Sequence, residues 1–342
     1  MYDMGKISYF IRRLARIDLK RFRETLGTIR AQTGRGTPYL LVDLLICGLG
    51  YNAGYMDYMI ARMDRLSHAQ RKTVITRGVS NGIVRRMNDK AYWHYFDDKA
   101  LFNTTFSRWV KRAWLRVDAG SKEEDLAAFC KGKGAMFAKP LDGSSGVGVE
   151  RLEAEDCRDA RALLLRLREK GDCVLEEALI QHPTMAAIYP GSVNTVRIAT
   201  LLGDKASGIV YAFLRIGNGR VMDNVDCGGM AARVDLDSGV INTVAADKQG
   251  REYARHPLTD APITGFQLPF FEEAKAACLE AMRLVPQMRF VAWDVAITPQ
   301  GPEFIEGNSF PSHAVPQFAA HYPDGIGILP EFERFISLKG DA

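Results

Sequence analysis

The segment WDVAITPQGPEFIEGN, residues 293–308, constrains the fold most, because it predicts two strands joined by a tight turn. Large apolar residues alternate along the first strand, so Asp294 falls on the opposite face among small side chains. The turn residues TPQGP favour a hairpin that closes symmetrically about Gln300. In that register Asp294 lies directly opposite Glu306, and Asn308 points to the same face.

Opposed carboxylates at this position predict a bound cation. The Cβ atoms of directly opposed residues in an antiparallel pair are only about 5 Å apart, so two carboxylates there repel each other unless a cation lies between them. The three side chains offer only oxygen ligands, which favour Mg²⁺, or else Mn²⁺. A solvent-facing polar strand face and a hairpin slipped by one residue are the alternatives. We therefore expect a metal site formed by Asp294, Glu306 and Asn308.

A second motif, FAKPLDGSSGVGVE at residues 137–150, predicts a β-hairpin with a glycine-rich tip. Glycine lets the backbone approach a ligand closely, and successive backbone N–H groups form a concavity for phosphate oxygens. The motif is neither a Walker A loop nor a dinucleotide fingerprint, because strands flank it on both sides. An ordinary glycine-rich hairpin is the alternative. The candidate nucleotide contacts are Lys139, Gly143, Ser144, Ser145, Gly146 and Val147.

The rest of the sequence divides into a helical first third and a β-rich remainder. Helical spacing of apolar residues extends to about residue 115, with breaks expected at the glycine-containing segments 34–38, 48–54 and 78–82. Helices are also expected at about 155–170 and 270–285. The expected strands are 136–140, 147–152, 173–177, 195–202, 208–216, 231–236, 240–245, 290–297 and 303–308.

Weaker signals come from charged residues in or beside strands. Glu176 and Glu177 end a strand, where a carboxylate can accept ribose hydroxyls, although a surface strand end explains them equally well. Arg197 lies in a mostly apolar strand and would be costly to bury without an anion, so a ligand anion or a structural salt bridge is expected. Lys99 is, on local grounds, a solvated helix lysine.

The polar segment GNGRVMDNVDCGGM, residues 217–230, is longer than a hairpin needs. Loops of this kind often carry binding residues, so we expect a substrate lid, with a loop that has no role as the alternative. The candidate lid residues are Asn224, Asp226, Gly228 and Gly229.

Composition and charge narrow the class of protein. The 342 residues include 45 Lys and Arg against 41 Asp and Glu, and a net charge of +4 is too small over this length for a general nucleic-acid binder. The six cysteines and six histidines show no metal-ligand spacing, and unpaired cysteines favour a reducing cytoplasm. We expect small molecules as partners, with no export signal and no membrane span. The oligomeric state stays open.

Most of the surplus charge lies in residues 1–35, which carry nine basic and three acidic residues. Apolar residues recur between these charges at helical spacing, as in a basic amphipathic helix. Such a helix could lie on the inner face of an anionic membrane, or it could be a solvated helix packed on its own domain. Peripheral membrane contact is therefore one of two interpretations.

Together these motifs resemble the ATP-grasp superfamily over roughly residues 95–330. More narrowly, DKALFN, FAKPLDGSSGVGV, NTVRIATLL, DN…GGMAARVD and WDVAITPQGPEFIEGN resemble the sugar-transfer-associated ATP-grasp family. The resemblance implies an α+β fold in which two lobes clasp ATP, preceded by a mainly helical region. The implied domains are 1–95, helical and basic; 96–178, a small lobe with the glycine-rich hairpin; and 179–342, a large lobe with the metal site.

The resemblance also implies roles for single residues. Lys99 and Lys139 would contact ATP phosphates, residues 174–177 would line the adenine and ribose, and Arg197 would contact a phosphate or carboxylate. Many superfamily members carry an arginine beside the metal aspartate on its strand, where this sequence has Ala-Trp at 292–293. Arg197 would then take that arginine's role and, with Lys139, act as a catalytic residue.

The reaction that the resemblance implies is the ATP- and Mg²⁺-dependent joining of a carboxylate to an amine through an acyl phosphate. Polysaccharide synthesis, another sugar conjugate or a secondary metabolite is the implied setting. A kinase of the same fold that phosphorylates a small-molecule acceptor is one alternative. A nucleotide-binding or membrane-docked module without catalysis is the other.

Overall fold

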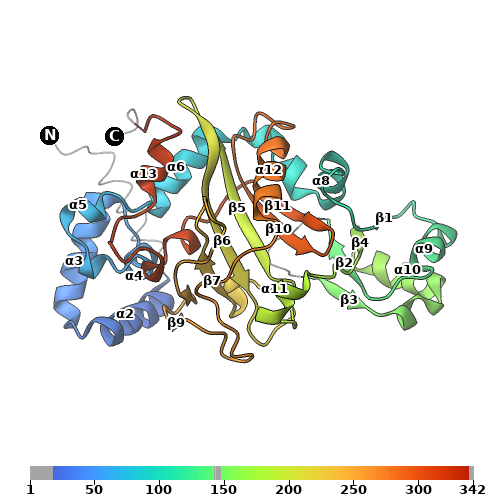
Figure 1. Ribbon diagram of the computed structural model, residues 1–342, viewed down its shortest axis with the longest axis horizontal. Helices are drawn as coiled ribbons and strands as arrows, with labels where there is room; N and C mark the ends of the chain where they lie inside the picture. Colours follow the sequence, from blue (N-terminus) through green and yellow to red (C-terminus); the bar gives the residue numbers. More distant parts are fainter. Residues whose placement is uncertain (1–17, 142, 144–147, 339–342) are drawn as a thin grey trace.

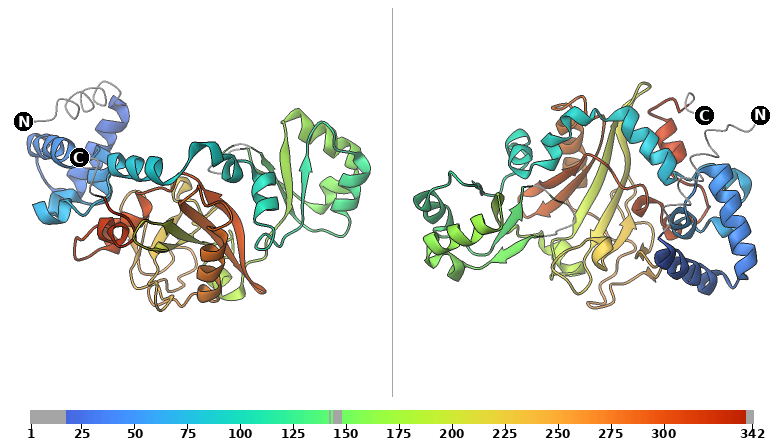
Figure 2. Two further views of the ribbon diagram at one scale, coloured as in Figure 1. Left: turned by 90° about the horizontal axis from the view of Figure 1, so that it is seen from above. Right: turned by 180° about the vertical axis from the view of Figure 1, so that it is seen from behind.

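The computed structural model describes residues 18–141, 143 and 148–338. Three parts follow one another along the long axis: the N-terminal helices, a seven-stranded sheet (the large sheet), and a four-stranded sheet with its own helices (the small lobe) (Figure 1). Figure 2 shows from two further sides that the N-terminal helices and the small lobe lie at opposite ends. Neighbouring strands in both sheets are antiparallel. The architecture is the expected α+β fold preceded by helices.

The N-terminal helices pack around a small core of their own. Asp18 caps the first turn of α2, and Gly34 ends that helix in left-handed backbone with a φ of 67°. Asp43 is buried in this core, where it accepts hydrogen bonds from Tyr58 and Arg71. The elements are α2 (Leu19–Thr33), α3 (Thr37–Tyr51), α4 (Tyr55–Ile60), η1 (Met63–Arg65), α5 (His68–Arg71), α6 (Arg77–Met87), η2 (Lys90–Tyr92), α7 (His94–Asp97) and α8 (Lys99–Thr105).

The expected helix break at residues 78–82 is wrong, because α6 runs through both glycines of that segment. A Cβ atom added at Gly78 would stand 3.2 Å from the Cβ of Asn52, the residue that ends α3. Glycine therefore permits two segments to approach closely here and does not interrupt a helix. The chain does break within 34–38 and 48–54, but the gaps between α2, α3 and α4 are only 34–36 and 52–54, because α3 runs through Gly48 and Gly50 to Tyr51.

The small lobe consists of one sheet with helices on one face. Its strand order is β1-β4-β2-β3, and leucines of its two α-helices pack against the sheet. The expected helix at 155–170 is divided in two, because Asp159 caps a new helix with its side chain. The elements are β1 (Trp114–Val117), α9 (Glu123–Cys130), β2 (Met136–Pro140), β3 (Glu150–Leu152), η3 (Ala154–Arg158), α10 (Ala160–Glu169) and β4 (Cys173–Glu177).

The large sheet has the strand order β11-β10-β5-β6-β7-β8-β9. The strand expected at 231–236 ends at residue 233, where the chain approaches a turn at 236–238. The strand expected at 240–245 is reduced to isolated bridges at Val240 and Ile241 and to Ala245, which begins β8. The elements are α11 (Pro183–Ile188), β5 (Thr195–Leu202), β6 (Ser207–Ile216), η4 (Val225–Cys227), β7 (Met230–Arg233), β8 (Ala245–Ala246), β9 (Glu252–Tyr253), α12 (Phe271–Ala281), β10 (Phe290–Thr298), β11 (Gly301–Asn308), η5 (Val315–Gln317), η6 (Ala319–His321) and α13 (Leu329–Glu333).

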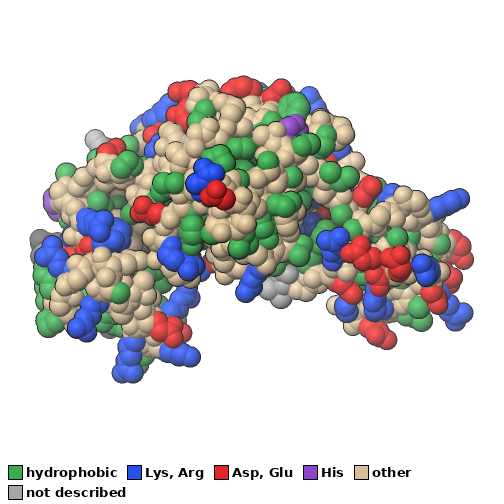
Figure 3. Space-filling view, turned by 60° about the horizontal axis from the view of Figure 1, so that its bottom comes forward, with side chains coloured by type: hydrophobic (Ala, Val, Ile, Leu, Met, Phe, Trp, Pro, Cys, Tyr) green, Lys and Arg blue, Asp and Glu red, His purple; other side chains and the backbone are tan. Residues whose placement is uncertain are grey.

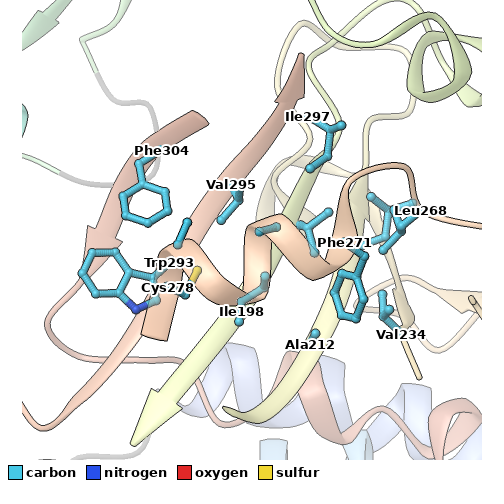
Figure 4. Packing of buried hydrophobic residues seen from close by; sticks show 14 of the residues in the cluster. Ile198, Ala212, Val234, Leu268, Phe271, Cys278, Trp293, Val295, Ile297 and Phe304 are labelled. Atoms are coloured by element: carbon cyan, nitrogen blue, oxygen red, sulfur yellow. The ribbon is translucent and has the colours of Figure 1, made fainter. Parts of the chain in front are cut away.

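The two faces of the large sheet carry different cores. Helix α12 covers one face, where Phe271 and Cys278 pack against strand residues such as Trp293 and Val295 (Figure 4). Helices α6 and α13 cover part of the other face. Because side chains alternate along a strand, Asp294 points to this second face, on the side of the N-terminal helices. The prediction that Asp294 lies opposite the large apolar residues of its strand is confirmed.

The helices before the small lobe belong to the core of the large sheet. Phe96, Phe102 and Phe106 surround Trp293, and the rings of Phe106 and Trp293 meet edge to face at 5.1 Å between centroids. Because α7 and α8 pack against the large sheet, the small lobe begins after α8. The division of the chain at residue 95 stays a prediction.

Candidate active site

The hairpin of β10 and β11 places Asp294 opposite Glu306, as expected. Nearer the turn, from the pair Val295 and Phe304 onward, the register is offset by one residue. A β-bulge that adds one residue to β11 restores the expected pairing at the carboxylates. The prediction of a hairpin symmetric about Gln300 is therefore wrong near the turn and right at the site.

Two arginines from neighbouring strands hold Asp294. Arg197 on β5 donates to both carboxylate oxygens at 2.5 Å, and Arg215 on β6 donates to Oδ2 at 2.6 Å. Arg215 also donates to Asp223 at 2.7 Å. Burial opposes the ionisation of Asp294, but the two guanidiniums outweigh it and lower the pKa of the carboxyl to about 2. Arg197 thus takes part in a buried salt bridge, which is one of its two expected roles.

Glu306 and Asn308 complete the group on β11. Burial and the negative charge of Asp294 raise the pKa of Glu306 above its usual range. Asn308 donates its amide N–H to the carbonyl oxygen of Ala292 at 3.2 Å, which leaves its side-chain oxygen to act as a ligand. Asp294, Glu306, Asn308, Arg197 and Arg215 together are called the carboxylate cluster below.

The carboxylate cluster fits a hard divalent cation. Nowhere in the described residues are three His, Cys, Asp or Glu side chains grouped to hold a metal, so a cation here would need the amide oxygen of Asn308 beside the two carboxylates. Three oxygen ligands suit Mg²⁺ or Mn²⁺. Each carboxylate oxygen has two lone pairs, so Asp294 can bind a cation while it accepts hydrogen bonds from the arginines.

Lys99 and Lys139 both lie at the base of the glycine-rich hairpin. Lys99, in the first turn of α8, donates to the carbonyl oxygens of residues 141 and 143 at 3.3 and 3.0 Å. Lys139 on β2 forms an ion pair with Glu176 at 2.6 Å. Gly143 has a φ of 121°, a conformation that favours glycine. The other expected phosphate contacts, Ser144, Ser145, Gly146 and Val147, lie outside the described residues.

Glu176 is buried and does not end the strand in solvent. Its carboxylate accepts hydrogen bonds from Arg112, Lys139 and Asn103 at 2.6 to 3.0 Å. Burial opposes its ionisation, but Arg112 and Lys139 outweigh it and hold the pKa of Glu176 well below its usual range. The carboxylate therefore holds Lys139 in place. Glu177, the next residue, is only partly buried.

The loop at 217–230 connects β6 to β7 and is attached to the carboxylate cluster. Asp223, which pairs with Arg215, also accepts a hydrogen bond from the backbone N–H of Thr195 at 3.0 Å. A Cβ atom at Gly229 would stand 2.5 Å from the carbonyl oxygen of Asp223, so only glycine fits there. Among the other candidate lid residues, the side chain of Asn224 caps η4, Asp226 pairs with Lys248, and Gly228 has a φ of 97°.

The segment after Asn308 connects the carboxylate cluster to the N-terminal helices. Ser309 donates to Asp97 at 3.1 Å. The carbonyl oxygen of Ser312 accepts from the hydroxyl of Tyr211, which lies on the same face of the large sheet as the cluster. His313 pairs through Nε2 with Asp57 of α4 at 2.8 Å. The N-terminal helices thus reach one edge of the site.

Sequence reasoning missed Arg215, Arg112 and His313. Arg215 is the charged residue in the apolar strand SGIVYAFLRI, just as Arg197 is in TVRIATLL. The argument that a cation in an apolar strand needs an anionic partner could therefore have identified Arg215 as well. Arg112 lies in a basic segment before β1, and nothing in its spacing predicts that its side chain is only 3% exposed. His313 acquires its partner only through the tertiary fold.

A family model described as sugar-transfer associated ATP-grasp matches residues 79–331 of the chain. The chain belongs to this family. The match confirms the resemblance and the ATP-grasp fold. None of the curated proteins compared with the chain matches it.

Several solved ATP-grasp structures are similar at low identity. D-alanine-D-alanine ligase from Coxiella burnetii is 11% identical over 70% of this chain and 56% of its own, with a TM-score of 0.43. ATP-grasp ligase PsnB with its minimal precursor is 12% identical over 79% and 72%, with a TM-score of 0.42. D-cycloserine synthetase DcsG is 13% identical over 75% and 76%, with a TM-score of 0.44. The chain thus spans little more than half the length of D-alanine-D-alanine ligase. The family to which the chain belongs is shown by the family model and not by these structures.

Proposed function

We propose that this ATP-grasp protein is an ATP- and Mg²⁺-dependent ligase that joins a carboxylate to an amine through an acyl phosphate. Synthesis of a polysaccharide, another sugar conjugate or a secondary metabolite is the proposed setting, in the cytoplasm. The observation that carries the proposal is the carboxylate cluster, in which Asp294 and Glu306 face each other beside Arg197 and Arg215. Placing a second carboxylate beside the buried Asp294 is costly, and a scaffold without chemistry has no use for it.

ATP would lie between the small lobe and the large sheet, with its phosphates at the glycine-rich hairpin. Lys99 and Lys139 lie at the base of that hairpin and supply positive charge there. Glu176 acts as a positioning residue, because its buried carboxylate fixes the ammonium group of Lys139. Residues 174–177, with Glu177 at the partly exposed end of β4, would line the adenine and ribose.

Phosphoryl transfer would take place at the carboxylate cluster. Arg197 and Arg215 offset the negative charge that develops on the transferred phosphoryl group. Asp294, Glu306 and Asn308 would hold Mg²⁺, which when bound offsets charge on the phosphate oxygens and orients them. The substrate carboxylate attacks the γ-phosphorus and ADP leaves; the amine then attacks the acyl phosphate and releases inorganic phosphate. No covalent bond to the protein is required.

The acceptor would enter between the large sheet and the N-terminal helices. The pair of Asp57 and His313 supports this direction, because it joins those helices to the segment that follows Asn308. Figure 3 shows the molecule hollowed between the N-terminal helices and the small lobe. The loop at 217–230, with its candidate residues Asn224, Asp226, Gly228 and Gly229, would cover the substrates.

The experiment that tests this function supplies ATP, Mg²⁺ and hydroxylamine with a panel of amino acids and sugar acids. A ligase forms ADP, phosphate and the hydroxamate of the accepted carboxylate. Asp294→Asn should lower hydroxamate formation at least about 10²-fold, since it removes a charge that orients the cation and arginines. Asp260→Asn is the matched control, because Asp260 also pairs with an arginine but is exposed. ADP with a phosphorylated acceptor and no hydroxamate would favour the kinase instead.

A further inference from the structure

Helix α3 exposes a broad apolar surface (the α3 face). Six large side chains on this 15-residue helix are each 44–59% exposed: Tyr39, Leu41, Val42, Leu45, Ile46 and Leu49. The only charged residue of the helix, Asp43, is buried on the other side. Single exposed apolar residues are ordinary, but six on one helix form a contiguous patch of the kind that marks an interaction site.

The α3 face lies far from the nucleotide site. Figure 1 shows α3 at the outer edge of the molecule, with the N-terminal helices between it and the large sheet, and the small lobe at the opposite end. Hydrophobic side chains line this edge of the molecule in the space-filling view (Figure 3). A partner bound to the α3 face would therefore leave the carboxylate cluster and the glycine-rich hairpin open.

Positive charge predominates on the N-terminal helices that carry the α3 face. Between residues 18 and 77, eight Lys or Arg residues are exposed against two acidic residues. The guanidinium of Arg35 lies over the ring of Tyr39 at 4.8 Å, at the start of the helix. At its end, Tyr51 contacts His68 of α5, and the exposed Lys72 follows that helix. The partner must therefore accept apolar side chains in the middle and cations at the rim.

An anionic lipid surface has this combination of properties. A 15-residue helix is about 22 Å long, too short to cross a bilayer, and no helix in the described part of the chain is long and apolar enough to do so. A helix with one apolar side and basic surroundings suits the plane of the interface, with its cations at the headgroups. A second copy of the chain is disfavoured, because pairing two α3 faces would bring their basic rims together.

We propose that the α3 face docks the enzyme on an anionic phospholipid membrane. Helix α3 lies in the plane of the interface and inserts Val42, Leu45, Ile46 and Leu49 among the acyl chains. Arg35 and the other exposed cations bind phosphate headgroups. The apolar side chains of this surface lie on α3, outside the basic segment 1–35 considered in the sequence, whereas Arg35 and the exposed cations of α2 belong to that segment. Residues 1–17 lie outside the described residues.

The test is sedimentation of the full chain with vesicles at about 0.1 M salt, where charges more than about 10 Å apart are screened. Vesicles of phosphatidylcholine with phosphatidylglycerol should bind the protein at least tenfold more strongly than vesicles of phosphatidylcholine alone. Val42→Asp/Ile46→Asp should lower the partition coefficient on anionic vesicles at least tenfold. The matched control is Leu258→Asp/Leu284→Asp, because these leucines are 62% and 53% exposed and the charge change is the same.

Circular dichroism and binding of an ATP analogue check that both double variants are folded. Equal binding of Val42→Asp/Ile46→Asp and the unchanged chain would overturn the proposal, since another segment would then hold the membrane. Binding without preference for anionic vesicles would overturn it as well. A dimer in analytical ultracentrifugation that only the α3 variant disrupts, without vesicle binding, would make the α3 face a contact between two copies.

Discussion

Arg112 connects the small lobe to the large sheet through a buried guanidinium. Its Nε and Nη2 atoms donate to Glu176 of β4 at 2.9 and 3.0 Å. Its Nη1 atom donates to Glu303 of β11 at 3.2 Å, and carbonyl oxygens of residues 304 and 305 accept the remaining N–H groups. Because Arg112, Glu176 and Glu303 are each at most 5% exposed, water cannot replace a lost partner.

The substitution Arg112→Met keeps an unbranched apolar stem and removes the charged guanidinium group. It leaves Glu176 and Glu303 buried without their shared cation, a change that costs about 3–5 kcal/mol. This loss in the free energy of unfolding corresponds to roughly 150- to 5,000-fold in the unfolding equilibrium constant. Nucleotide affinity should fall as well, because Glu176 also fixes Lys139.

Arg108→Met is the matched control. Arg108 also forms an ion pair, with Glu280 at 2.5 Å, but its side chain is 71% exposed. An exposed ion pair contributes at most about 1 kcal/mol to the free energy of unfolding, however short the distance between its charged atoms. Urea unfolding followed by circular dichroism should therefore separate the two variants by at least about 2 kcal/mol. Equal losses, or no loss for Arg112→Met, would refute the reasoning that burial and not distance sets the strength of these pairs.

Three further predictions concern charge and pH. Lys139→Ala should weaken binding of an ATP analogue by about 2 kcal/mol in calorimetry with the fold retained, and unchanged affinity would exclude a phosphate contact. Glu306→Gln should lower turnover at least about 10²-fold in the hydroxamate assay, and full activity would exclude Glu306 as a metal ligand. Burial lowers the pKa of His321 from 6.5 to about 4, so the folded state binds fewer protons and stability falls as the pH drops through this window. The free energy of unfolding should fall by about 3 kcal/mol between pH 6.5 and 4, and His321→Phe should reduce this fall. An equal fall in the variant would exclude this histidine as the cause.

Strand positions could be predicted from sequence because local patterns determine them. The strands at 136–140, 173–177 and 195–202 have the expected bounds, since apolar β-type runs end there at glycine or polar turns. The β-bulge in β11 could not be predicted from the hydrophobic pattern, because Phe304 and Ile305 are both apolar and either could pair with Val295. Only the tertiary fold determines which register reaches Asp294.

The partners of the site residues depend on long-range contacts. Asp294 was found from its strand, but its engagement by Arg197 and Arg215 requires the order of β10, β5 and β6 in the sheet. Glu176 was expected at a strand end in solvent, and it is buried because Arg112, 64 residues earlier in the sequence, packs against it. A charged residue inside an apolar strand predicts that a partner exists without identifying it.

The measurement that tests the proposed ligase reaction most directly follows oxygen-18 from the substrate carboxylate. An accepted carboxylate, labelled in both oxygens, is incubated with ATP, Mg²⁺ and an amine, and the released phosphate is analysed by mass spectrometry. Attack of the carboxylate on the γ-phosphorus predicts one labelled oxygen in each phosphate, and no such transfer with Asp294→Asn. Unlabelled phosphate, or a stable phosphorylated product in its place, would contradict an acyl phosphate and with it the assignment as a ligase.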